Sequence, residues 1–241
     1  IKSVEQTVQD AVEAVEAGIK TLKLKAGLNH QRDLEALRAV REAVGDEVEI
    51  RIDPNGAWSV PTAITMINRM ERYAPQYIEG PLPNWDWDGM RRVKQRTGVP
   101  ICICTGLNGR GLMDPGEVLL RLTDLIRQDA IDVISTDPMR AGGLLGFKKL
   151  CAICEGAGIA VVMHWCRTGI SQAAWLHCCA ANNATFLAQD VLCSNLPPGG
   201  VEDVITFPLT HQNGYMTLPK GPGLGVKLDA DQLAKWSFVQ F

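Results

Sequence analysis

The sequence contains no long apolar run and no block of like charges. No stretch approaches the roughly 18 to 20 apolar residues that span a bilayer, and residues 1–10 lack the apolar core of a signal peptide. The formal net charge is −3, which argues against a polybasic membrane patch or a nucleic-acid-binding stripe. We therefore expect a soluble, cytoplasmic protein that binds neither membranes nor nucleic acid.

The sequence also lacks the cysteine spacing of a disulfide scaffold or a zinc module. Its eight cysteines are spread over 241 residues, in a chain that is neither short nor visibly secreted, which favours a reducing compartment. Cys151 and Cys154 form a C-x-x-C, but they lie inside an amphipathic helical pattern, and no second pair follows at zinc-site spacing. We interpret them as core residues.

What the sequence does contain is a regular alternation of strand and helix patterns. It opens with a helical pattern in which Ser3 and Gln6 form a capping box, and a second helix is expected over 33–44, before Gly45. Seven segments are typical of strands: 19–25, 48–52, 77–78, 101–104, 133–135, 159–163 and 185–188. The length allows one large domain or two small ones.

These strand patterns recur about every 27 residues, the length of one strand, one helix and two short loops. Such a repeat predicts a parallel sheet covered by helices, either doubly wound or closed as a barrel. A barrel prefers eight strands, and the chain begins on a helix, so we expect an eighth strand upstream of Ile1 in a longer protein. Residues 1–196 would form the βα units, and residues 197–241, rich in proline and glycine, a C-terminal segment packing back on the barrel or its cap.

Polar residues follow the predicted strands at their C-terminal ends, where barrel enzymes place their chemistry. These residues are Lys23, Lys25, Asp53, Asn55, Glu79, Asp137, His164 and Asp190. Taken singly, these residues can be explained without a function. The two lysines could be solvated, residues 53–56 could form only a turn, and His164 could be a hydrogen-bonded core residue. Together they favour a functional site, because charges converging on one rim are costly to desolvate unless they bind a metal or each other.

The residue types suggest a specific chemistry. Asp53 and Glu79 follow neighbouring strands and offer the hard oxygen ligands that suit Mg²⁺. Lysine and histidine supply two candidate proton-transfer groups. Such a site could remove a proton α to a carboxylate, with the metal neutralising the enolate that forms.

Motifs spread over nearly the whole chain resemble the enolase superfamily, specifically its mandelate racemase subgroup with the acid-sugar dehydratases. They are GIKTLKLKAG, DPNGAWS, YIEGPLP, TGLN, DPMRAGG, VVMHW and LPKGPGLGV. The resemblance implies a (β/α)7β TIM-like barrel with an N-terminal α+β capping domain, of which the cap and the first strand are missing here. It also implies Mg²⁺, a small carboxylate substrate such as an acid sugar, and a homo-oligomer.

The resemblance assigns roles to individual residues. Lys25 resembles the base of the K-x-K motif, and Lys23 its partner near the substrate carboxylate. Asp53 and Glu79 resemble the first two metal ligands, and Asp137 and His164 a dyad in which the aspartate orients the imidazole. Asn55 and Asp190 fall where substrate contacts are expected. In the muconate lactonizing branch the position of Asp137 resembles a lysine, so the aspartate favours the racemase and dehydratase side, between which the sequence does not choose.

The sequence departs from the subgroup at the third metal ligand. A glutamate is expected after the fourth predicted strand, but Leu107 stands there, and counting forward by the Asp53–Glu79 interval reaches Thr105 instead. Neither Leu107 nor Thr105 has a carboxylate, although Asn108 could contribute a carbonyl oxygen. Mg²⁺ should therefore bind weakly or not at all, and the alternative is a non-catalytic barrel retained for binding or assembly.

Overall fold

A computed structural model describes residues 2–105, 115–164, 168–190, 204–207 and 209–236 of the chain. The helices are α1 (Val4–Glu16), α2 (His30–Val44), α3 (Val60–Met70), α4 (Trp87–Lys94), α5 (Pro115–Arg127), α6 (Gly143–Ala157), α7 (Gly169–Ala180) and α8 (Ala230–Trp236). The strands are β1 (Thr21–Lys25), β2 (Glu49–Asp53), β3 (Tyr77–Glu79), β4 (Ile101–Cys104), β5 (Val133–Thr136), β6 (Ala160–Met163), β7 (His211–Gln212) and β8 (Tyr215–Met216), with short 3-10 helices at Glu71–Tyr73 and Asn183–Thr185. No helix in these ranges is long and apolar enough to cross a membrane.

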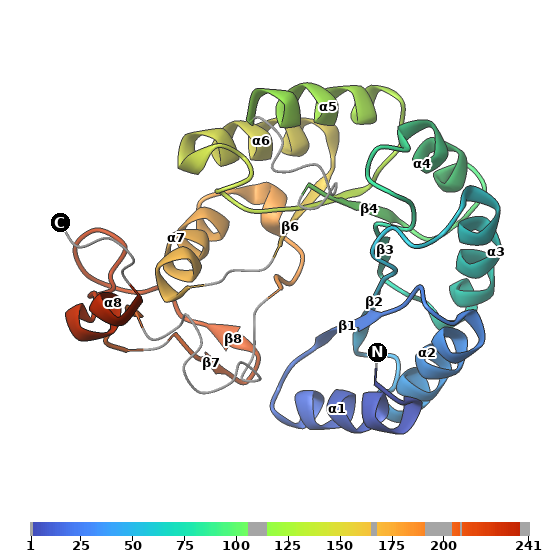
Figure 1. Cartoon of the computed structure of the whole chain (residues 1–241), viewed down its shortest axis with the longest axis horizontal. Helices are drawn as coiled ribbons and strands as arrows, with labels where there is room; N and C mark the ends of the chain where they lie inside the picture. The colour runs from blue at the N-terminus through green and yellow to red at the C-terminus, as the bar shows by residue number, and fades with distance from the viewer. Residues whose placement is uncertain (1, 106–114, 165–167, 191–203, 208, 237–241) are drawn as a thin grey trace.

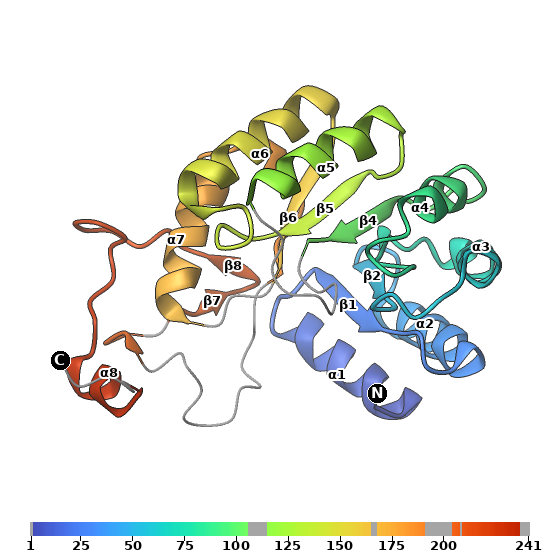
Figure 2. The ribbon, with the colours of Figure 1, turned by 45° about the horizontal axis from the view of Figure 1, so that its top comes forward.

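Strands β1 to β6 form one parallel sheet in the order of the sequence. The sheet curls, and the connecting helices lie around its outer, convex side (Figure 1; Figure 2). This arrangement confirms the prediction of a parallel α/β fold of the barrel type. It excludes the doubly wound alternative, in which helices would cover both faces of the sheet.

Capping residues explain where the helices start and stop. The side chain of Ser3 accepts a hydrogen bond from the backbone N–H of Gln6 at 3.2 Å, which is one half of the predicted capping box. The other half is not formed, because the side chain of Gln6 donates to Asp10 at 2.9 Å. Helix α2 begins at His30, earlier than expected, because Asn29 caps it by accepting from the N–H of Arg32 at 3.0 Å. It ends before Gly45, whose φ of 76° is a conformation that favours glycine.

The curled sheet separates two apolar clusters. Alternate residues such as Ile101 and Ile103 of β4 face outward and pack in the large core against the helices. The residues between them face inward and form a smaller cluster inside the curl: Tyr77, Cys102, Val133, Ala160 and Val162, with Leu187 packed against them. The inward rows continue past this cluster to the C-terminal ends of the strands, where the polar residues lie.

The predicted seventh strand at 185–188 is wrong. The segment holds the end of a 3-10 helix and irregular backbone. The side chain of Gln189 takes hydrogen bonds of the kind a seventh strand would make with β6: its Oε1 accepts from the N–H of Met163 at 2.9 Å, and its Nε2 donates to the carbonyl of Val161 at 3.3 Å. A single side chain therefore substitutes for strand pairing here.

The C-terminal part contributes a small hairpin that the sequence analysis did not predict. Strands β7 and β8 pair antiparallel around Asn213 and Gly214, whose φ values are 50° and 78°. The turn lies against the α1–β1 connection, since a Cβ atom added to Gly214 would come within 2.2 Å of the carbonyl oxygen of Gly18. This close approach requires glycine at position 214.

Candidate active site

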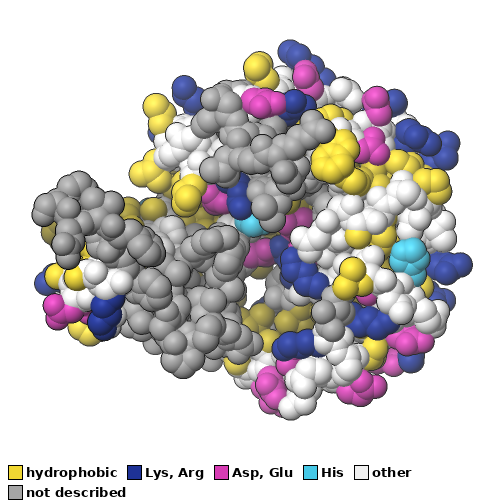
Figure 3. All heavy atoms as spheres, viewed as in Figure 1, with side chains coloured by type: hydrophobic (Ala, Val, Ile, Leu, Met, Phe, Trp, Pro, Cys, Tyr) yellow, Lys and Arg dark blue, Asp and Glu magenta, His cyan; other side chains and the backbone are white. Residues whose placement is uncertain are grey.

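The register of the first three strands places four predicted residues on the inner face of the curl. Lys25 lies directly opposite Asp53 across β1 and β2. Arg51 lies opposite Tyr77, so Asp53, two residues further along β2, comes beside Glu79 at the end of β3. Acidic, basic and histidine side chains gather around the hollow at the centre of this face (Figure 3). The prediction that these strand ends converge is met.

Ion pairs join the lysines to the carboxylates. Lys25 pairs with Asp53, and Lys23 pairs with both Glu79, at 2.6 Å, and Asp190. Burial alone would lower the pKa of Lys23, but Asp190 and Glu79 outweigh it and raise that pKa above its ordinary value. Lys23 is therefore a fixed cation at neutral pH.

Glu79 is the most deeply buried carboxylate of this group, with its side chain 3% exposed. Burial raises its pKa, Lys23 lowers it, and the neighbouring charges of Asp53 and Asp190 raise it again, leaving it above the ordinary value. The charge on Glu79 thus depends on a cation nearby, which Lys23 supplies.

Asp190 is held by an arginine that the sequence analysis did not single out. Arg51, which is 1% exposed, donates to Asp190 at 3.1 Å, to the carbonyl of Ala188 at 2.7 Å and to Gln76 at 2.7 Å. Its guanidinium also lies 4.7 Å from the ring centroid of Tyr77. Position 51 could have been found from the sequence, because it precedes Asp53 by two residues and so shares its inward face.

The predicted hydrogen bond between Asp137 and His164 is replaced by an arginine between them. Arg140 donates to Asp137 through its backbone N–H at 3.0 Å and its Nη1 at 2.6 Å, and the same Nη1 contacts Nδ1 of His164. A guanidinium offers only donors, so Nδ1 is the acceptor, and a neutral ring then carries its proton on Nε2. The expected dyad would need the opposite tautomer.

The backbone fixes His164 at this position. Its N–H donates to the carbonyl of Thr136 at 2.7 Å, which extends the β5–β6 pairing by one residue. Burial, followed by the charges of Arg140 and Lys23, lowers the pKa of His164 to about 4. The ring is therefore neutral at physiological pH.

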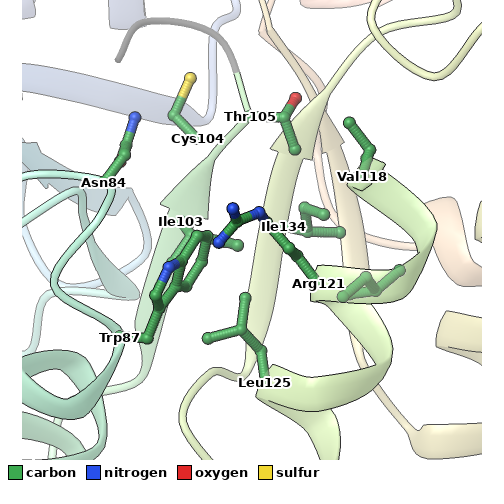
Figure 4. A pocket seen from close by; sticks show the side chains of 10 residues that line it. Asn84, Trp87, Ile103, Cys104, Thr105, Val118, Arg121, Leu125 and Ile134 are labelled. Atoms are coloured by element: carbon green, nitrogen blue, oxygen red, sulfur yellow. The ribbon is translucent and has the colours of Figure 1, made fainter. Parts of the chain in front are cut away.

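Some of the remaining predicted residues lie in the described part of the chain and others do not. Asn55 lies in the turn after β2 with a φ of 53°, and its backbone N–H donates to Asp53 at 3.0 Å. The turn interpretation of residues 53–56 is therefore correct, and the substrate role of Asn55 stays a prediction. Thr105 follows Cys104 at the end of β4 (Figure 4), and its hydroxyl bonds Thr136 at 2.8 Å. Leu107 and Asn108 fall outside the described residues.

These donors fit Mg²⁺ in part. Asp53 and Glu79 are adjacent hard oxygen ligands facing one cavity, as an oxygen-only ion requires. No third carboxylate joins them among the residues that the structure describes around β4, whose inward-facing terminal residue is Cys104. Asp53 and Glu79 are therefore the two residues of the described site suited to holding the ion.

A comparison with known families identifies the family of the chain. Residues 6–232 match the family described as "Enolase C-terminal domain-like". The chain belongs to this family. The match covers the whole curled sheet and most of the C-terminal part.

Relatives within the superfamily carry out several reactions. The chain is 29% identical to the L-Ala-D/L-Glu epimerase of Clostridium acetobutylicum, over 94% of this chain and 61% of that protein. It is 26% identical to the arabinonate dehydratase of Saccharolobus solfataricus, over 93% of this chain and 57% of that protein. The chain thus spans about 60% of the length of these relatives.

A solved structure gives a similar result. The L-talarate dehydratase from Polaromonas sp. JS666, complexed with Mg and L-glucarate, matches with a TM-score of 0.80 and 27% identity, over 97% of this chain and 59% of that one. The shared family and fold therefore extend to an enzyme that was crystallised with magnesium and an acid sugar.

Proposed function

We propose that this chain carries the proton-transfer site of an enzyme that removes the proton α to a carboxylate, as an acid-sugar dehydratase or a racemase does. The observation that supports this most directly is the convergence of Lys23, Lys25, Asp53, Glu79 and His164 at one end of the curled sheet. The names of the arabinonate and L-talarate dehydratases favour an acid sugar as the substrate class.

The lysines have different roles. Lys23 stays charged between Glu79 and Asp190, so it is suited to holding the substrate carboxylate rather than to taking a proton. Lys25 is more accessible, with its side chain 58% exposed, and is the candidate base on its side of the cavity. Its pairing with Asp53 keeps its Nζ near the inner face.

Asp53 and Glu79 would hold Mg²⁺, which when bound would supply positive charge to neutralise the enolate. With Leu107 in place of a third carboxylate, we expect weak binding. Lys23 adds to this weakness, because its ammonium lies 2.6 Å from Glu79 and the ion would have to replace it there.

His164 is the second proton-transfer group, and Arg140 determines which proton it can move. With Arg140 donating to Nδ1, the ring presents Nε2–H, so it acts as a hydrogen-bond donor. To accept a proton on Nε2, the ring must carry its proton on Nδ1, where the N–H can donate a hydrogen bond to Asp137. A substrate carboxylate that attracts Arg140 away from Nδ1 would permit this change.

The test is proton exchange at the α-carbon. The chain is incubated in D₂O with Mg²⁺ and a panel of acid sugars, and NMR follows both deuterium incorporation and 2-keto product. Exchange with product indicates dehydration, and exchange with inversion alone indicates racemisation. Lys25→Met and His164→Asn should each lower exchange by about 100-fold or more, the scale of one general acid or base.

Lys20→Met serves as the control, since Lys20 precedes β1 outside the inward row. Binding of an acid sugar without any exchange would overturn the catalytic proposal and favour a non-catalytic binding role.

A further inference from the structure

A second set of metal-binding atoms lies beside the Asp53–Glu79 pair. A carboxylate oxygen of Glu79, Sγ of Cys104 and a ring nitrogen of His164 all lie within 4.8 Å of one another. They stand at the ends of β3, β4 and β6, where the inward rows of the sheet converge. No other three His, Cys, Asp or Glu residues meet the same limit in the described part of the chain.

The chemistry of these donors differs from that of a magnesium site. One nitrogen, one oxygen and one sulfur ligand suit a borderline divalent ion such as Zn²⁺, whereas Mg²⁺ selects oxygen. We propose that Glu79, Cys104 and His164 bind a Zn²⁺-class ion, with a fourth position open to the cavity. This inference rests on their geometry alone and does not depend on the proposed function.

The spacing is compatible with a tetrahedral ion after a small closure. Bonds of about 2.0 to 2.3 Å place ligand atoms about 3.3 to 3.8 Å apart around such an ion. The present ligand–ligand distances are at most 4.8 Å, so each ligand atom would move toward the ion by no more than about 1 Å. Binding replaces the thiol S–H bond of Cys104 with a sulfur–metal bond and releases that proton to water.

Neighbouring side chains can still pair with Lys23 if the ion takes Glu79 from it. Lys23 pairs with Glu79 but also with Asp190, so the ammonium keeps a carboxylate partner if Glu79 turns to the ion. The ion would then replace Lys23 as the cation that the buried Glu79 requires. Binding therefore leaves no charge of this group unpaired.

The outer partner of His164 is present as well. A metal-bound histidine usually donates its other ring N–H to a carboxylate. Asp137 is available for this, because Arg140 contacts both Asp137 and His164 through the same Nη1. Ligation through Nε2 moves the ring proton to Nδ1, so Arg140 must withdraw. Arg140 thus competes with the ion, and its removal should strengthen binding.

The experiment is a Co²⁺ titration of the metal-free 241-residue chain. Thiolate coordination gives a near-ultraviolet charge-transfer band that Zn²⁺ should abolish by displacement. Cys104→Ser should remove the band and weaken Co²⁺ binding by more than about 100-fold, since even outer-shell partners are commonly worth 10- to 100-fold. Arg140→Gln should increase the affinity, and Cys179→Ser, a cysteine on α7, is the matched control.

Asp53→Asn separates this site from the proposed Mg²⁺ site, because it should weaken Mg²⁺ binding and leave the Co²⁺ band intact. Alkylation with mass spectrometry provides a readout on the unmodified chain: Zn²⁺ should protect Cys104 and leave Cys179 reactive. A wild-type chain without the band, or a band that survives Cys104→Ser, would overturn the inference. The band can be present whether or not the chain catalyses α-proton exchange, so the two proposals fail independently.

Discussion

At the scale of single residues, the site is governed by which cation stands next to which polar group. Burial and then Arg140 lower the pKa of His164, and Lys23 opposes the rise that burial gives the pKa of Glu79. Both effects follow from the cost of holding a charge away from water. Each can be measured without knowing the substrate.

The pKa of His164 makes stability depend on pH in a defined window. The pKa is lowered from the ordinary value of 6.5 to about 4 in the folded, metal-free chain. As the pH falls through 6.5 the unfolded chain takes up a proton at this residue, and the folded chain does so only near 4. The contribution is therefore fully present above pH 6.5 and is lost as the pH falls toward 4.

Urea unfolding across this window should show the loss, and His164→Gln should make the pH dependence shallower. Arg140→Gln should raise the pKa of His164, as measured by NMR, but leave it below 6.5, because burial is the larger cause. An unchanged histidine pKa in Arg140→Gln would show that the guanidinium does not reach the ring in solution.

Variants of Lys23 and Lys25 can be compared to measure how much each ion pair contributes to the free energy of unfolding. Lys23 is 19% exposed and pairs with Glu79, which is 3% exposed, whereas Lys25 is 58% exposed and pairs with Asp53, which is 6% exposed. Lys23→Met leaves a buried carboxylate without its cation and should lower the free energy of unfolding by about 3 kcal/mol or more. Lys25→Met should cost less, about 1 to 2 kcal/mol, because the exposed Lys25 ammonium is screened by solvent and Asp53 keeps the hydrogen bond from the N–H of Asn55 at 3.0 Å.

Chemical denaturation measures both changes. Adding Glu79→Gln to Lys23→Met should recover part of the loss, because it removes the unpaired charge. Equal costs for the two lysine variants would contradict the burial argument.

At the scale of elements, the six sheet strands could be predicted because each is either a short apolar run, as in β4 and β6, or an alternation of apolar and polar residues, as in β1 and β2. The predicted segment 101–104 is the observed β4, and 48–52 differs from β2 by one residue at each end. The polar residues after these strands were then placed correctly by the geometry of a parallel sheet. The segment 185–188 has the same apolar character, but its neighbour Gln189 bonds the edge of β6 instead.

The contacts of Gln189 predict a local effect. Besides its bonds to β6, its Nε2 donates to the carbonyls of Leu187 at 2.6 Å and Thr185 at 3.1 Å. Gln189→Ala should lower the free energy of unfolding by about 1 to 3 kcal/mol, because buried backbone groups lose their partners.

Hydrogen exchange should show the largest loss of protection at the amide of Met163, which bonds Gln189 at 2.9 Å. Gln31→Ala, which removes an exposed bond to Glu35 within α2, is the control and should change little. If Met163 exchanged at the same rate in Gln189→Ala, the side chain would not be acting in place of a strand.

At the scale of the whole molecule, the ends of the curled sheet are joined by side chains rather than by strand pairing. β1 and β6 are not neighbours in the sheet, and Arg51, on β2, links the β1–β2 side to residues 188 and 190. The sequence could not predict this connection. An arginine two residues before a candidate metal ligand shows which face it occupies, but not which distant backbone it will reach.

Arg51 should therefore determine how firmly the curl is held. Arg51→Met leaves Asp190, Gln76 and the carbonyl of Ala188 without their donor and should lower the free energy of unfolding by about 3 kcal/mol or more. Arg51→Lys keeps the charge but cannot reach three acceptors with one planar group, so its cost should be intermediate. The lost contacts are those that link β2 to residues 188 and 190. Hydrogen exchange should therefore become faster first in residues 186–190 and in β1, and later in α3 and α4. Uniform quickening across all of these segments would mean that Arg51 contributes to general stability and does not hold the curl together.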